Sequence, residues 1–408
     1  SDITLYVVAL VVVGAAFTLL EPRWWSLHIL YRARLRDAFA STVVWSDAAR
    51  WIREAHGESD DAQPTEPLAP VWPLPRRGER RIDEFAEHGK SATGPAHLIC
   101  CTAARRPRTG TGIRGESFVI APDEVTLYES TENGTVRERS AATEDYTAAL
   151  SPRARTESMW VALSGAAVAP AMGRMTRGTL GTLFAVLNVR LGVWMPNPTW
   201  IRPGAGADRA RHARYPRAAM PSLAKEIAGA WSVDDMHLYI TDGGHWDNLG
   251  LVELLRRRCR TIICVDAAGD TPGTHATLRQ AAQLAELQVM AKIIDVPDPE
   301  PIDAAPQDPA YRLLTVQYNG PDGSPEACGT IIYLQARVWP SADLSLRAYA
   351  AEDPLFPNYS TGNQLLSERQ FRHMVDLGRC AAEQALGAKE VREAVSEGLG
   401  TRGPVTDA

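Results

Sequence analysis

Apolar and polar positions along this chain follow two periods, and the change of period marks the predicted elements. In the second half, short apolar runs at 237–241, 260–266 and 291–296 are separated by runs with helical spacing at 249–258 and 275–290. Strands that alternate with helices in this way are typical of parallel sheets with crossover helices. We therefore expect an α/β fold with a mostly parallel sheet flanked by helices.

Further segments complete this prediction. Apolar runs at 311–318 and 329–337, joined by a Gly- and Pro-rich turn, predict an antiparallel hairpin at one edge of the sheet. A final helix is expected at 365–387. Three strands are expected in the first half, at 97–101, 117–120 and 159–163, the last running into a helix of small residues.

The start of the chain has the pattern of a membrane segment. Residues 3–20 are apolar and carry no charge, which is close to the length that spans a bilayer. A Trp pair follows at 24–25, and Arg32, Arg34 and Arg36 come next. The positive-inside rule places this basic flank, and the domain after it, in the cytoplasm. The alternative is a helix buried in a protein core.

Composition shifts divide the chain into five predicted parts. We expect a transmembrane or membrane-anchoring helix at 1–21, a basic juxtamembrane helix at 22–56, a Pro-rich linker at 57–80, an α/β domain at 81–390 and a flexible tail at 391–408. The juxtamembrane helix either lies along the membrane surface or packs on the domain. An apolar start without a Met suggests the C-terminal part of a longer protein, entered at its last membrane span.

Bulk composition excludes some classes of function. The 408 residues are 45% hydrophobic and 23% charged, which is typical of globular proteins. A net charge of -6 argues against a nucleic-acid partner. The six cysteines are scattered without C-x-x-C spacing, so we expect reduced thiols and no zinc site. We also expect no cofactor.

The most informative motif is TDGGHWDNLG at 241–250. Asp242 stands at the end of a strand-like run, and Gly243 and Gly244 follow it. Two glycines allow close backbone approach and leave nothing bulky over the carboxylate. A carboxylate presented in this way can act as a catalytic acid or base. The simpler interpretation is an ordinary Asp-Gly turn.

Ser164, in MWVALSGAA, is the candidate nucleophile. A strained nucleophile elbow requires small residues two positions before and after the serine, and here these are Ala162 and Ala166 in place of glycine. The other interpretation is a serine that caps the start of a helix. A Ser–Asp dyad is chemically sensible because the carboxylate accepts the hydroxyl proton while backbone amides stabilise the oxyanion. His245 could assist.

Two other patterns have weaker support. Asp242, His245, Asp247 and Asp266 could form a metal set, but no second His cluster accompanies them, so we expect no metal. The Gly-rich run at 110–115 has the composition of an anion or oxyanion loop. The segment before it is no buried strand, which favours a chance loop.

The segment TDGGHWDNLGLVELLRRRCRTIICVDA resembles the Asp-Gly-Gly block of the patatin-like phospholipases, a family related to cytosolic phospholipase A2. It is most similar to a bacterial, membrane-attached branch of that family. Supporting stretches are SLHILYRARLRDAF, VALSGAAVAPAMG, LFAVLNVRLGVWMPNP and FPNYSTGNQLLSERQF. Together these stretches extend over most of residues 25–387.

The resemblance implies a membrane-attached serine acyl hydrolase of the phospholipase type, with membrane lipids as substrate and its catalytic domain facing the cytoplasm. Asp242 would be the dyad carboxylate, Gly243 and Gly244 would shape its turn, and Asn248 would tie that turn down. Ser164 resembles either the elbow of the cytosolic phospholipases or the Ala-Ser-x-Ala-x-Pro stretch of patatins, and the proline at 170 favours the second. The nucleophile and the oxyanion loop are then expected upstream in the same protein.

The alternative is non-enzymatic. Because the chain contains no clean copy of the oxyanion loop or of the Gly-x-Ser-x-Gly elbow, it could be a catalytically incomplete, membrane-tethered scaffold or sensor domain.

Overall fold

The structure is a computed structural model in which the chain divides into two compact units. The first unit comprises residues 1–128 and 138–242, and the second comprises 129–137 and 243–408. The residues described are 96–106, 115–131, 134–150, 154–165, 192–201, 222, 224–226, 228–269, 274–298, 309–359 and 366–400. The predicted segments at 1–21, 22–56 and 57–80 lie outside them.

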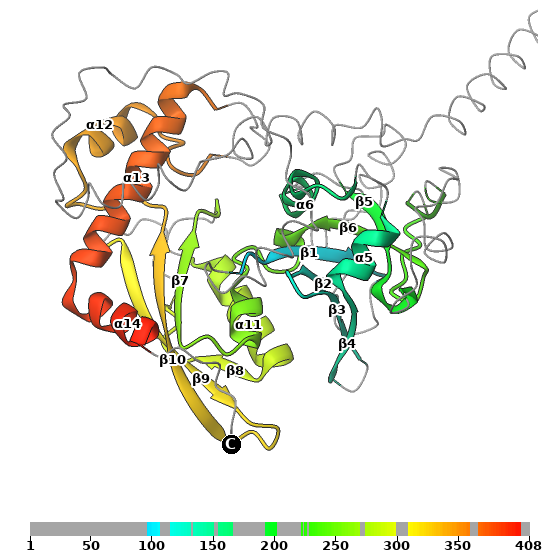
Figure 1. The fold of residues 1–408 in the computed structure, drawn as a ribbon. Coiled ribbons are helices and arrows are strands. Elements are labelled where there is room, and N and C mark those ends of the chain that lie inside the picture. The colour runs from blue at the N-terminus through cyan, green and yellow to red at the C-terminus, as the bar shows by residue number, and fades with distance from the viewer. Residues whose placement is uncertain are drawn as a thin grey trace, which may run out of the picture. The chain divides into compact units, whose positions relative to one another are not determined.

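The first unit is built on a six-stranded sheet with the order β4-β3-β2-β1-β6-β5 (Figure 1). Its strands are β1 (Ile99–Ala104), β2 (Gly115–Ile120), β3 (Glu124–Ser130), β4 (Val136–Ala142), β5 (Val193–Pro196) and β6 (His237–Asp242). The pairs β1–β2, β2–β3, β1–β6 and β5–β6 are antiparallel. Its helices include α5 (Thr143–Ala149), α6 (Glu157–Ser164) and the short 3-10 helix η5 (Pro198–Trp200).

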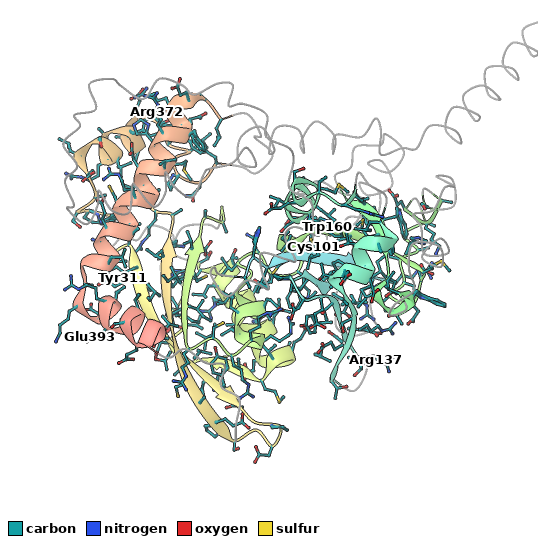
Figure 2. All side chains as sticks on the ribbon, in the orientation of Figure 1. Cys101, Arg137, Trp160, Tyr311, Arg372 and Glu393 are labelled. Carbon is teal, nitrogen blue, oxygen red and sulfur yellow. The ribbon has the colours of Figure 1, made fainter. Side chains whose placement is uncertain are left out.

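The core of the first unit lies between one face of this sheet and the helices α5 and α6. Alternate residues of the strands point into it, as Leu238 and Ile240 of β6 do. Tyr146 and Trp160 of the helices are almost fully buried there, and Figure 2 labels Trp160. The Tyr146 hydroxyl donates to the Pro196 carbonyl at 2.7 Å, so the core contains this polar atom with its hydrogen bond made.

The second unit is built on a four-stranded sheet with the order β7-β10-β9-β8. Its strands are β7 (Thr261–Asp266), β8 (Ala291–Ile293), β9 (Tyr311–Asn319) and β10 (Pro325–Gln335). Its helices include η7 (Gly243–His245), α10 (Leu251–Arg256), α11 (Ala276–Val289), α12 (Leu344–Glu352), α13 (Glu368–Gly387) and α14 (Lys389–Gly400).

Helices cover both faces of the second sheet. Leu255 of α10 and Leu278 of α11 pack with Ile331 of β10 on one face. On the other face, Leu377 of α13 packs with Ile332, the next residue of β10. Figure 1 shows α11 on one side of the sheet and α13 with α14 on the other. Because β10 buries side chains on both faces, it forms the centre of this unit.

The predicted mostly parallel sheet is wrong. Among the described strands, β7 and β10 are the one parallel pair. The strand predicted at 237–241 exists as β6, but it pairs with β1 and β5 in the antiparallel sheet and not with β7. The predicted hairpin of β9 and β10 also exists. It is inserted between β7 and β8, so it occupies the centre of its sheet and separates two strands that were expected to be parallel neighbours.

The strand predicted at 159–163 is also wrong, because these residues lie in helix α6. Met159, Trp160 and Leu163 have helical spacing and all three enter the core, a pattern that five apolar residues in a row conceal. The strands at 97–101 and 117–120 are confirmed as β1 and β2. The helices at 249–258, 275–290 and 365–387 are confirmed as α10, α11 and α13.

The predicted apolar membrane helix has no counterpart in the described part of the chain. None of the helices there is both long and apolar enough to cross a membrane. Residues 3–20 themselves lie outside that part. Helix α14 occupies the start of the segment that was expected to be a flexible tail.

A pair of isoleucines tests the packing of the second unit. Ile331 of β10 is fully buried, whereas Ile263 of the edge strand β7 is 55% exposed. Ile331→Ala should lower the free energy of unfolding by about 2–5 kcal/mol because it leaves a cavity. Ile263→Ala should lower it by less than about 1 kcal/mol. Urea denaturation measures both, and equal losses would contradict the central place of β10.

Candidate functional site

Asp242 is the last residue of β6, and its partner on β1 is Cys101. Directly opposed side chains of an antiparallel pair lie on the same face of the sheet. The Asp242 carboxylate therefore shares the face of Cys101, which is the face that α6 covers. Asp242 is half-buried, so the strand end places a carboxylate at the boundary between the core and solvent.

Ser164 lies near the same end of this sheet, but its hydroxyl is already engaged. It is the last residue of α6, so it stands neither on a strand-to-helix elbow nor at a helix start, and both predicted settings are wrong. Its Oγ donates to the carbonyl of Cys100 at 2.6 Å. Ser164 thus bonds to Cys100 of β1, and Asp242 pairs with the next residue of that strand, Cys101. The hydroxyl proton goes to a carbonyl and not to a carboxylate.

The thiol opposite Asp242 is no better as a nucleophile. Cys101 is buried, and burial raises the pKa of its thiol well above the ordinary value, with Cys100 and Asp242 adding to the rise. The thiolate is the nucleophilic form of cysteine. Cys101 therefore stays protonated near neutral pH.

The chain turns sharply after Asp242. Gly243 and Gly244 begin the 3-10 helix η7, which ends at the half-buried His245. The carbonyl of Gly243 accepts two hydrogen bonds, from the amides of Trp246 at 3.0 Å and of Asp247 at 2.9 Å. Neither glycine introduces a side chain into this turn.

Asp247 ties the turn to the helix that follows. Its buried carboxylate accepts hydrogen bonds from the amides of Leu249 at 3.1 Å and Val252 at 2.8 Å. Asn248, to which the family resemblance gave this task, is exposed. The residue before α10 is Gly250, whose φ of 62° lies in the left-handed region where glycine is favoured.

Two contacts hold Trp246, which is buried beside Asp247. Its carbonyl accepts a hydrogen bond from the Gln280 side chain of α11 at 2.9 Å. The Arg256 guanidinium lies 5.9 Å from the centre of its ring, within the range of a cation–π contact. Arg256 also pairs with the buried Glu253 of α10. The turn is thus attached to both helices on that face of the second sheet.

Asp266, one of the four residues considered above as metal ligands, already accepts hydrogen bonds within the protein. It ends β7 and is buried, and it accepts hydrogen bonds from the Tyr333 hydroxyl and from the amide of Ala268 at 2.8 Å. Burial raises the pKa of the nearby Cys264 thiol to about 12, with Asp266 and Asp247 contributing. No three His, Cys, Asp or Glu side chains of the described residues form a group that could hold a metal ion.

The role of Asp247 is what sequence reasoning missed at this turn. The sequence contained a usable signal, because a glycine at the helix start supplies no side-chain cap and an acidic residue stands shortly before it. The Gly-rich run at 110–115 cannot be placed as an oxyanion loop, since 110–114 lie outside the described residues and Gly115 begins β2.

Comparison with known proteins does not assign a family. No protein-family model matches the chain, and no curated protein or solved structure matches it. The function therefore has to be argued from the residues themselves.

The burial of Asp247 predicts a pH dependence of stability. Desolvation raises the pKa of its carboxyl above 3.8, although the amide hydrogen bonds and Arg256 offset part of the rise. The unfolded state then loses its proton first as the pH increases, so stability falls from about pH 4 up to the folded pKa and remains lower above it. The stability of the native chain relative to Asp247→Asn should fall over that range, as measured by urea denaturation at several pH values. A constant difference would contradict the buried setting.

Proposed function

We propose that Asp242 is the general base of a Ser–Asp acyl hydrolase that acts on lipid esters. In this reaction the Asp242 carboxylate accepts the proton of a serine hydroxyl while the serine oxygen attacks the ester carbonyl. An acyl-enzyme forms, the alcohol leaves, and water then releases the fatty acid.

The position of Asp242 is the observation that supports this proposal. Asp242 is half-buried at the end of the inner strand β6, where it pairs with Cys101 of β1, while the pairing of β6 with β5 ends at Ile240. The two glycines after it add no side chains to the turn that follows. A base must combine a fixed position with access to the substrate, and a half-buried residue at a strand end is compatible with both. The proposal thus depends on local geometry and on the Asp-Gly-Gly resemblance, and not on a parallel sheet.

The proposal places the serine nucleophile and the oxyanion donors in an upstream segment of the same protein. Ser164 donates its proton to the Cys100 carbonyl from a helix end. A nucleophilic serine is instead activated by donating to its base, and it needs backbone amides aimed at the developing oxyanion. We therefore treat Ser164 as a structural residue.

The proposed substrate is a membrane lipid, and the proposed location is a membrane surface on its cytoplasmic side. The support is the uncharged sequence at 3–20, followed by the basic residues Arg32, Arg34 and Arg36. Cell fractionation tests this part separately from catalysis.

A scaffold or sensor without catalysis is the second candidate. It is favoured by one observation: the Ser164 hydroxyl is bonded to a carbonyl, and the Cys101 thiol opposite Asp242 is protonated. A domain of this kind would bind lipid without hydrolysing it.

Substitution of the carboxylate tests the proposal. In the complete protein, Asp242→Asn should lower the hydrolysis of fatty-acid esters in mixed micelles by about 10²- to 10⁴-fold, because the amide cannot accept the proton. The asparagine has nearly the same shape, so the thermal unfolding midpoint should change little. Fatty-acid release measures the reaction.

Two further variants sharpen this test. Asp123→Asn removes an exposed carboxylate from the turn between β2 and β3 and should leave the rate unchanged. Ser164→Ala should retain hydrolysis and lose only the bond to Cys100, worth about 1 kcal/mol of stability. Full activity of Asp242→Asn would end the proposal, and inactivity of a folded Ser164→Ala would identify that serine as the nucleophile.

A further inference from the structure

We infer that Asp247 is the positioning residue for Asp242. The inference depends on the proposed function, since it assigns to Asp247 the task of holding the backbone that directly follows the general base. Asp247 does not touch the reacting atoms. It fixes the turn from Gly243 to Val252, and that turn is joined to Asp242 by a peptide bond.

Asp247 closes this turn from both sides. Its backbone amide donates to the carbonyl of Gly243, four residues earlier, at 2.9 Å. Its side chain accepts from the amides of Leu249 at 3.1 Å and Val252 at 2.8 Å, up to five residues later. One residue thus links the first residue after the general base to the first turn of α10. Its removal would release both carboxylate contacts at once.

Asp247 caps a short helix. Helix α10 has six residues, from Leu251 to Arg256. A helix this short does not form without tertiary support. Gly250 precedes it in a left-handed conformation and makes no side-chain cap hydrogen bond. The carboxylate of Asp247 therefore provides the acceptor that the free amides at a helix start require.

The burial of the carboxylate shows that this contact is specific. Asp247 is 5% exposed, and burial raises the pKa of its carboxyl. A charged group is retained in such a place where fixed donors surround it. Its oxygens accept from the amides of Leu249 and Val252, and the Arg256 guanidinium of α10 and the Cys264 thiol of β7 interact with it electrostatically.

The matched control is Asp322, which makes the same kind of contact without burial. Its exposed carboxylate accepts from the amide of Ser324, two residues later, at 3.0 Å, in the turn between β9 and β10. Asp322→Ala removes a carboxylate from an equivalent local hydrogen bond in the same unit, far along the chain from the Asp-Gly-Gly turn. It should change neither hydrolysis nor the exchange of the 243–252 amides.

The experiment combines amide hydrogen exchange with kinetics in the complete protein. In Asp247→Ala, exchange at Leu249 and Val252 should become about tenfold faster or more, because each amide loses its acceptor. Displacement of a general base lowers the rate of the chemical step more than binding. We therefore expect kcat for ester hydrolysis to fall about 10- to 100-fold, with KM within about twofold. Asp247→Asn retains one acceptor oxygen and should have an intermediate kcat.

The outcomes separate this inference from the proposed function. Hydrolysis that survives Asp242→Asn would end the proposed function and this inference together. Hydrolysis lost in Asp242→Asn but kept in Asp247→Ala and Asp247→Asn would overturn the inference alone. So would unchanged exchange at Leu249 and Val252. If Asp247→Ala does not fold, the intermediate kcat of Asp247→Asn decides the question.

Discussion

The antiparallel pairing of β6 with β1 is the constraint on which the rest of the structure depends. It opposes Asp242 to Cys101, Thr241 to Thr102 and Ile240 to Ala103. With β5 on the other side, β6 becomes an inner strand, and its alternate apolar residues enter the core beneath α6. The end of this ladder sets the backbone of Asp242 on its β1 side. It also takes this strand out of the sheet to which β7 belongs.

The local elements around the site could be predicted from the sequence, and their pairing could not. The runs around Ile240, Ile262 and Leu278 have periods that identify strand, strand and helix without any partner. Which strands pair is decided by long-range contacts that periodicity does not encode. The order of strand, helix and strand from 237 to 266 is also that of a parallel crossover unit, and the structure uses it to link two different sheets.

For the candidate site, too, the sequence predicted local features and missed the long-range contacts. The Asp-Gly-Gly motif predicted that Asp242 ends a strand, which β6 confirms, although an ordinary Asp-Gly turn explains the same residues. The setting of Ser164 was missed because the apolar run before it has no clear period, and the hydroxyl contact with Cys100 joins residues 64 positions apart. The task of Asp247 was missed because Asn248 carried the family resemblance, and burial is what separates these two neighbours.

Fluorophosphonate labelling of the complete protein tests the central claim most directly, because this probe bonds covalently to a serine only when a base activates it. The account predicts one labelled serine in the native protein, located by peptide mapping at a residue other than Ser164, and loss of that label in Asp242→Asn. Equal labelling in Asp242→Asn would contradict Asp242 as the base. A native protein that takes up no label would contradict the hydrolase and leave the scaffold.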